Sequence, residues 1–214
     1  MPMKNDREYR NMTMEIREAE TEDQADQMIV RGYASTFNEP YTLYEDEYWS
    51  LQEVVDTKAF DNTDMSDVIM QYDHQGRVFA RNKNNTLTVT PDEHGLLIEA
   101  DLGGTELGRQ LYEEIRGGYT DKMSFGFTVD GEDILDTKDE NGKDLTVRTI
   151  KSVRKLYDVS AVSIPANDAT EISVRNLTDG EIERIQAERL AAEKEELERL
   201  RAEIRAKAMS GGNK

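Results

Sequence analysis

His74 and His94 are the two histidines of this 214-residue chain, and histidine is the side chain best suited to act as a general base near neutral pH. His94 lies in the segment PDEHG, where turn chemistry is sufficient to explain it. His74 ends the apolar segment VIMQYDH, directly before a turn that contains Gly76. A residue that leaves a rigid element in this way can present its side chain at the edge of a site. His74 is therefore the stronger candidate for a catalytic base.

Ser124 lies in a segment whose pattern indicates that another group approaches it. The segment KMSFGF, residues 122–127, alternates apolar with small or polar residues, which predicts a half-buried β-strand. Gly126 weakens such a strand, and a glycine there usually marks a bulge or the close approach of a backbone or a ligand. A serine hydroxyl becomes a nucleophile when an imidazole takes its proton. Two interpretations remain: Ser124 and His74 form a hydrolase site, or both are ordinary polar residues at strand ends.

The composition excludes several classes of site and partner. The chain has 45 acidic and 27 basic residues, a formal net charge of −18, which argues against nucleic acid as a ligand because phosphate binding needs Lys and Arg. It contains no cysteine, which excludes disulfides and thiolate sites, and its histidines lack zinc-site spacing, so we expect neither a metal nor another cofactor. The N-terminus lacks the apolar run of a signal peptide, and no segment approaches the ~20 apolar residues of a membrane span. These features indicate a soluble intracellular protein.

The elements that would position these residues are mostly strands. Alternation of apolar and polar residues predicts one β-hairpin over residues 12–34 and another over residues 87–102. Between Thr105 and Gly117 apolar residues recur every four positions, which predicts a helix that leads into the KMSFGF strand. A polar loop is predicted over residues 130–144, followed by strands in LTVRTI and YDVSAVSI. The predicted fold class is α+β, dominated by antiparallel strands.

The last part of the chain has a different composition. Thr178 and Glu181 fit a capping box, and Leu177 with Ile182 has the spacing of a hydrophobic staple, so a helix is predicted to start here. Up to about Ala208 the residues are mainly Ala, Glu, Lys, Arg and Leu, with an incomplete apolar stripe. A solvated single helix and a helix that binds a partner are both compatible with this pattern.

Several linked segments resemble the capsid-maturation (prohead) serine proteases of tailed bacteriophages. They are, in chain order, IVRGYASTFN, EVVDTKAFDN, VIMQYDHQGRVFAR, GLLIEADL, IRGGYTDKMSFGFTV and YDVSAVSIPANDA. The resemblance covers residues 12–176 and favours a protease domain over this range. Residues 1–11 are then expected to form a flexible leader, and residues 177–214 a charged amphipathic helix with a flexible end.

The resemblance implies a role for each residue of the site. In that family the histidine of the Asp-His motif is the base and the serine of the Ser-Phe-Gly-Phe motif is the nucleophile, which here are His74 and Ser124. Asp158 matches the family's acidic motif and is the candidate third member, although an aspartate before a strand is also common as a capping or ion-pairing residue. Phe125 and Gly126 are expected to lie at the substrate. The implied fold is similar to herpesvirus assemblin, an antiparallel β-barrel with surrounding helices.

The implied function is that of a serine endopeptidase of phage head morphogenesis, acting in the host cytoplasm inside the assembling prohead. Its expected substrates are the scaffold, or the N-terminal scaffolding segment of the major capsid protein, and the protease itself; self-association is left open, and no contact with nucleic acid or a membrane is expected. The alternative is a non-catalytic capsid scaffold or assembly chaperone that works through the charged helix. Because a scaffold has no need to bring His74 within hydrogen-bond reach of Ser124, the tertiary structure separates the two hypotheses.

Overall fold

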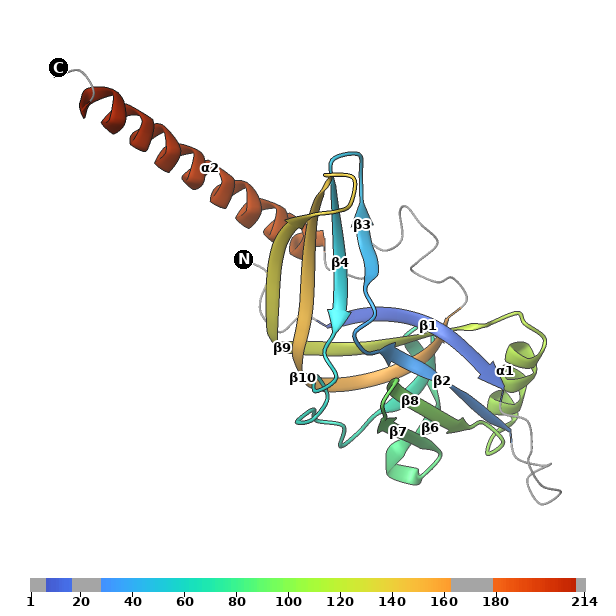
Figure 1. The fold of residues 1–214 in the computed structure, drawn as a ribbon. Coiled ribbons are helices and arrows are strands. Elements are labelled where there is room, and N and C mark those ends of the chain that lie inside the picture. Colours follow the sequence, from blue (N-terminus) through green and yellow to red (C-terminus); the bar gives the residue numbers. More distant parts are fainter. Residues whose placement is uncertain (1–6, 17–27, 163–178, 211–214) are drawn as a thin grey trace.

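The computed structural model describes residues 7–16, 28–162 and 179–210, shown as a ribbon in Figure 1. Its elements, in chain order, are β1 (Glu8–Ile16), β2 (Ile29–Thr36), β3 (Tyr41–Glu45), β4 (Trp49–Val55), β5 (Ile69–Tyr72), β6 (Gln75–Arg81), the 3₁₀ helix η2 (Asn82–Asn84), β7 (Leu87–Pro91), β8 (Gly95–Asp101), α1 (Glu106–Arg116), β9 (Lys122–Lys138), β10 (Asp144–Val162) and α2 (Asp179–Ser210). Strands predominate over helices, so the fold is a mixed α+β fold. Within the described ranges, no helix has the length and apolar character needed to cross a membrane.

Hydrogen-bonded pairing joins the strands into one sheet whose main path is β3-β4-β10-β9-β1-β2-β8-β7. β5 pairs with β10, and β6 pairs with β5, away from this path. The described strands do not pair in a closed ring, so the closed β-barrel implied by the resemblance is not found. The opening lies between β6 and β7, because the chain turns through η2 and the left-handed Asn85 (φ 60°) and does not continue the ladder. Pairing is also not purely antiparallel, since β10 runs parallel to both β4 and β5.

β9 and β10 are the longest strands, with 17 and 19 residues, and they pair antiparallel with each other. In Figure 1 both strands bend, and their outer parts form a blade with β3 and β4. The polar loop predicted over residues 130–144 is therefore wrong for most of its length, because residues 130–138 belong to β9. This part of the strand is mostly exposed, so its sequence lacks the alternation of a half-buried strand, and pairing with β10 makes it extended.

Both predicted hairpins and the predicted helix are confirmed. β1 pairs antiparallel with β2, and β7 pairs antiparallel with β8. α1 begins after Thr105, whose hydroxyl accepts a hydrogen bond from the backbone N–H of Gly108 over 3.0 Å and so caps the helix. After Arg116 the chain passes through Gly118, whose φ of 71° lies in the left-handed region that favours glycine at a helix end. The helix thus returns the chain to the start of β9.

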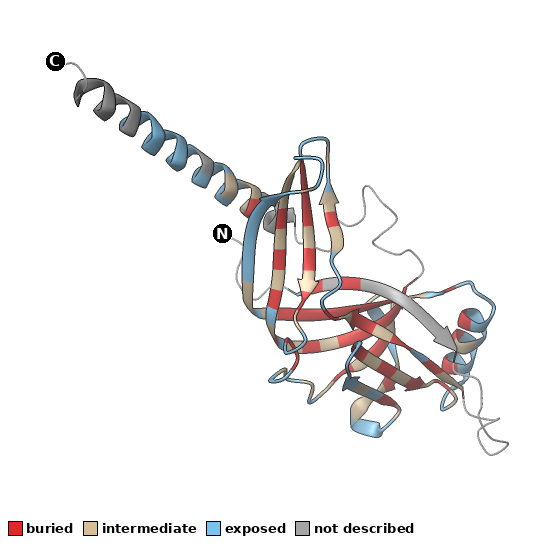
Figure 2. Ribbon diagram, viewed as in Figure 1, coloured by how far each residue is buried: buried red, intermediate tan, exposed pale blue. Residues whose placement is uncertain are grey.

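Two apolar cores stabilise the sheet (Figure 2). The larger core is built mainly from β2, β5, β8, β9, the inner part of β10 and α1. The smaller one combines residues of β3 and β4 with Ile185 of α2; its members on the sheet are Leu43, Trp49 and Leu51. Ile185 is 2% exposed, whereas Leu190 is 63% exposed, so α2 contacts the sheet at its start and projects beyond it. The predicted capping residues Leu177 and Thr178 lie outside the described residues.

A buried network of ion pairs holds the N-terminal end of β1 in the sheet. Arg10 donates to Glu53 of β4 over 2.6 Å from both Nε and Nη2, and Arg148 of β10 donates to Glu53 over 2.8 Å and to Glu8 over 2.6 Å. Burial by itself would raise the pKa of the Glu8 carboxyl, but the hydrogen bond and charge of Arg148, together with Arg10, lower that pKa from 4.5 to about 2. The Glu8 carboxylate is therefore charged at neutral pH, and the network ties β1 to β4 and β10.

This network corrects one expectation for the N-terminus. The flexible leader predicted for residues 1–11 includes the first residues of β1, which begins at Glu8. Glu8 and Arg10 are buried, and β1 pairs with β9 from Glu8 onward. Local pattern did not reveal the first residues of this strand because they alternate charged side chains, which only the buried network with β4 and β10 compensates.

Candidate active site

Ser124 and Asp158 lie on adjacent strands in the interior of the sheet. Ser124 of β9 pairs with Ser160 of β10, and Gly126 pairs with Asp158. Because alternate residues of a strand point to the same side, Ser124, Asp158 and Ser160 share one face. β1 lies on the other side of β9, and β5 lies on the other side of β10. Both strands are therefore held from two sides, which limits the freedom of the side chains that they present.

His74 reaches this face from the tight turn between β5 and β6. Tyr72 pairs with Gln75, so Asp73 and His74 are the two central residues of a hairpin loop. Their φ angles are 47° and 58°, and positive φ at both central positions is the property of a type I′ turn, whose twist matches that of the flanking strands. The backbone N–H of Asp73 donates to the carbonyl of Ala161 over 2.9 Å. This bond attaches the turn to β10.

The side chains of His74, Ser124 and Asp158 are in mutual contact. His74 Nε2 lies 2.6 Å from Ser124 Oγ, and His74 Nδ1 contacts Asp158 Oδ2. Ser124 and Asp158 are each 1% exposed, whereas the His74 side chain is 17% exposed. The imidazole thus lies between a hydroxyl and a buried carboxylate. In such an arrangement the ring can take the hydroxyl proton while the carboxylate holds the ring and balances its charge.

Two residues expected at the substrate lie on opposite faces of β9. Gly126 is buried, lies on the Ser124 face and pairs with Asp158. Phe125 is 1% exposed and stacks on Phe127, with ring centroids 4.6 Å apart, in the larger core. The Phe125 side chain therefore lies on the face away from Ser124, as strand alternation requires. The substrate-binding role of Phe125 and Gly126 stays a prediction.

The second histidine lies elsewhere. His94 is in the turn between β7 and β8, where its backbone N–H donates to Asp92 over 2.8 Å and its ring packs edge-on against Tyr33 at 4.5 Å between centroids. Both contacts are those of an ordinary turn residue, as its sequence context predicted.

Two further residues contact Asp158 and were missed by sequence reasoning. Ser160 Oγ donates to Asp158 Oδ2 over 2.9 Å. Its position two residues after Asp158 in a predicted strand was a usable signal, because residues i and i+2 share a face. Arg7, directly before β1, places Nη1 3.5 Å from Asp158 Oδ1. No local pattern could have indicated Arg7, since the contact joins segments far apart in the chain.

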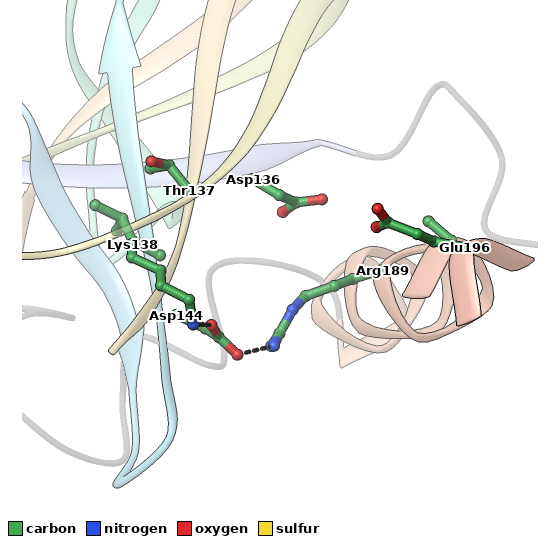
Figure 3. Close-up of a pocket in the computed structure, with 8 residues that line it drawn as sticks. Asp136, Thr137, Lys138, Asp144, Arg189 and Glu196 are labelled. Atoms are coloured by element: carbon green, nitrogen blue, oxygen red, sulfur yellow. Dashed lines mark hydrogen bonds and ion pairs between the residues drawn. The ribbon is translucent and has the colours of Figure 1, made fainter. Parts of the chain in front are cut away.

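A separate hollow of about 520 Å³ lies between the outer end of the β9–β10 hairpin and α2 (Figure 3). Charged side chains line most of it: Lys138 donates to Asp144 over 2.5 Å, and Arg189 of α2 donates to the same carboxylate. None of its lining residues belongs to the group around His74. The hollow lies where α2 contacts the hairpin. The group around His74 is therefore the better candidate for an active site.

Comparison with known proteins places the chain in a family. No curated protein and no solved structure matches the chain significantly. A family model described as caudovirus prohead serine protease matches residues 12–184, which is more than half of the chain. The matched range contains His74, Ser124 and Asp158. Members of this family are serine peptidases of capsid maturation. The chain therefore belongs to the caudovirus prohead serine protease family.

Proposed function

We propose that this protein is a serine endopeptidase in which Ser124 is the nucleophile, His74 is the general base and Asp158 orients His74. The observation that carries the proposal is the contact of one imidazole with both partners: Nε2 with Ser124 Oγ at 2.6 Å and Nδ1 with Asp158 Oδ2. Serine needs an adjacent base to be a nucleophile, and the base needs a third group to fix its tautomer.

In the first half of the reaction, Ser124 Oγ attacks the carbonyl carbon of the peptide bond while its proton moves to His74 Nε2. Nδ1–H of His74 donates to Asp158 Oδ2, so the carboxylate stabilises the imidazolium that forms. When the tetrahedral intermediate collapses, His74 returns the proton from Nε2 to the leaving amine, and an acyl group remains on Ser124. The nucleophile is a neutral hydroxyl at the start, so no other proton source is required.

In the second half, water takes the place of the amine. His74 removes a proton from the water, which attacks the acyl carbon, and Ser124 leaves with the proton from His74. His74 is the most exposed of the three side chains, at 17%, so substrate and water are expected to enter from its side. Gly126, on the same face as Ser124, is proposed to lie next to the bound peptide.

The proposed substrates are the scaffold or the N-terminal scaffolding segment of the major capsid protein, and the protease itself. Membership of the prohead protease family supports capsid-related protein substrates. α2 is proposed as the part that brings the enzyme to them, because Leu190, Leu197 and Leu200 are exposed on the helix beyond its attachment to the sheet (Figure 2). A helix with exposed leucines can lie in an apolar groove of a partner.

A non-catalytic scaffold or assembly chaperone was the alternative from the sequence. Such a protein could use α2 in the same way, but it gives no reason for a buried carboxylate, an imidazole and a serine hydroxyl to be aligned. The peptidase accounts for this alignment and the scaffold does not.

The test is co-expression with the major capsid protein and scaffold of the same phage, followed by mass spectrometry of the products. We expect new capsid or scaffold fragments with the wild-type chain and none with Ser124→Ala, a change that removes the nucleophile and leaves a residue that β9 can accommodate. His74→Ala should abolish cleavage, and His94→Ala, the matched control, should not. Cleavage by purified Ser124→Ala would refute the assignment.

Asp158→Asn separates the third residue from the other two. An amide in place of the carboxylate cannot hold the required tautomer, and in a serine protease triad this change lowers turnover by about 10⁴-fold. We expect a large but incomplete loss with the fold intact. A wild-type rate would return Asp158 to the role of a structural ion-pairing residue.

A further inference from the structure

Arg7 is placed to act on the proposed catalytic carboxylate. Its Nη1 lies 3.5 Å from Asp158 Oδ1, and its guanidinium lies over the Tyr157 ring, 3.9 Å from the centroid. The Arg7 side chain is 40% exposed, whereas that of Asp158 is 1% exposed. Arg7 therefore lies at the boundary between solvent and a carboxylate that solvent barely reaches.

The two oxygens of Asp158 have different surroundings. Oδ2 accepts from Ser160 and contacts His74. Oδ1 is buried and has no hydrogen-bond partner among the described residues; the ion pair with Arg7 is its contact with a charged group. An uncompensated buried carboxylate is costly, and a cation beside Oδ1 favours a rotation of the carboxylate that turns Oδ2 toward His74.

The sheet explains how a residue so far away in sequence reaches Asp158. β1 pairs with β9, and Tyr9 lies opposite Gly126, which lies opposite Asp158. Arg7 is two positions before Tyr9, and no side chain at Gly126 stands between β1 and β10 on this face. Glu8 and Arg10, on the alternate positions, hold β1 in place through the buried network with Glu53 and Arg148.

We propose that Arg7 is a positioning residue of the active site, which holds the Asp158 carboxylate turned toward His74. The proposal rests on the proposed peptidase function and extends it to a residue that lies before the range matched by the family. Displacement of Arg7 should therefore lower the reactivity of Ser124.

The experiment measures the reactivity of Ser124 directly with a fluorophosphonate probe, so no natural substrate is needed. Ser124 Oγ forms a bond to phosphorus, the phosphorus–fluorine bond breaks, fluoride leaves, and His74 takes the hydroxyl proton. Intact-mass spectrometry of the full-length protein gives the limiting rate constant and the half-saturating probe concentration. For Arg7→Met we expect a limiting rate about fivefold below wild type, the size of a partly exposed ion pair, with the half-saturating concentration unchanged.

Three comparisons separate positioning from a general structural effect. Arg7→Lys keeps the charge and should restore the rate to within about twofold of wild type. Arg154→Met is the matched control, because Arg154 is 43% exposed and lies 3.4 Å from Asp130, away from the site; its rate should equal that of wild type. In an Asp158→Asn background, Arg7→Met should have no further effect, since Arg7 acts through the carboxylate.

The labelling results separate a failure of the Arg7 inference from a failure of the peptidase assignment. Absence of labelling in the wild type, or equal labelling of Ser124→Ala, would overturn the peptidase and this inference together. Normal wild-type labelling with an Arg7→Met rate equal to or above wild type would overturn the inference alone. Equal losses in Arg7→Met and Arg7→Lys, or an undiminished effect of Arg7→Met in the Asp158→Asn background, would do the same.

Discussion

Ser160 donates a hydrogen bond over 2.9 Å to the same Asp158 oxygen, Oδ2, that contacts His74. Ser160 and Asp158 are separated by one position in β10, so strand geometry alone places their side chains on one face. Ser160 is fully buried, so bulk water does not reach its hydroxyl. The relationship makes Ser160 part of the support of the proposed triad, and its hydroxyl restricts where Oδ2 can lie relative to the imidazole.

Ser160→Ala should therefore lower the rate of Ser124 labelling by about tenfold, because a hydrogen bond to a charged group is lost. The rate of fluorophosphonate labelling is the measurement. Ser35→Ala is the matched control, since Ser35 is also a buried strand serine but its hydroxyl donates to the Thr36 carbonyl, in another part of the sheet. Equal rates in the two variants would show that the Ser160 hydroxyl does not support the site.

The turn that presents His74 gives a second prediction. Asp73 has φ 47°, a conformation that glycine adopts freely and β-branched residues strongly resist. Asp73→Gly should leave the His74 position and the labelling rate close to wild type. Asp73→Val should lower the free energy of unfolding by about 1–2 kcal/mol, because a β-branched residue strains the turn. It should also slow the labelling of Ser124, because the strained turn moves the imidazole ring of His74. Comparable rates in both variants, with comparable melting temperatures, would contradict this account of the turn.

The buried network predicts how stability depends on pH. The pKa of Glu8 is lowered from 4.5 to about 2, so its ion pairs contribute stability that is fully present above pH 4.5 and is lost as the pH falls toward 2. Glu8→Gln should lower the free energy of unfolding by about 3 kcal/mol at neutral pH, because Arg148 and Arg10 lose a buried partner. The difference from wild type should shrink as the pH is lowered through this window.

Urea unfolding at neutral pH and at about pH 3 provides the measurement for Glu8. Glu113→Gln is the control, because Glu113 is exposed and pairs with Arg116 on the surface of α1; we expect a change of less than about 0.5 kcal/mol. A Glu8→Gln variant as stable as wild type would show that the network is not coupled to folding.

α2 allows attachment and targeting to be tested separately. Ile185→Ala should destabilise the domain by about 2–4 kcal/mol, since it opens a cavity against Leu43, Trp49 and Leu51. The double change Leu190→Ser and Leu197→Ser alters only exposed positions and should leave stability and labelling unchanged. If α2 is the handle for the scaffold, the amount of this double variant in purified proheads should fall several-fold.

Normal incorporation of the double variant would remove the targeting role from α2. Truncation after Asn176 is a less specific test than these two leucines. It would also delete Ile185 and the Arg189 contact with Asp144, and so uncover the smaller core. Loss of solubility would then report on packing and not on targeting.

Local sequence patterns were sufficient for much of the molecule. Alternation predicted β7 and β8, the four-residue period between Thr105 and Gly117 predicted α1, and the strand pattern around Ser124 identified its glycine as unusual. These features depend on neighbours within a few residues, which the sequence displays directly. The motifs that resemble those of prohead proteases identified Asp158 and assigned roles to His74 and Ser124. The folded chain brings these three residues into contact.

Other features were decided by the tertiary structure alone. Residues 130–138 look like a polar loop but are strand, because β10 supplies the hydrogen bonds for their backbone. The parallel pairing of β10 with β4 and β5, and the open path of the sheet, depend on how distant segments meet. The approach of Arg7 to Asp158 likewise requires β1, β9 and β10 to be adjacent. Each is a contact between segments far apart in the chain, whose free energy arises only after the fold has paired the strands, so no local pattern of residues encodes it.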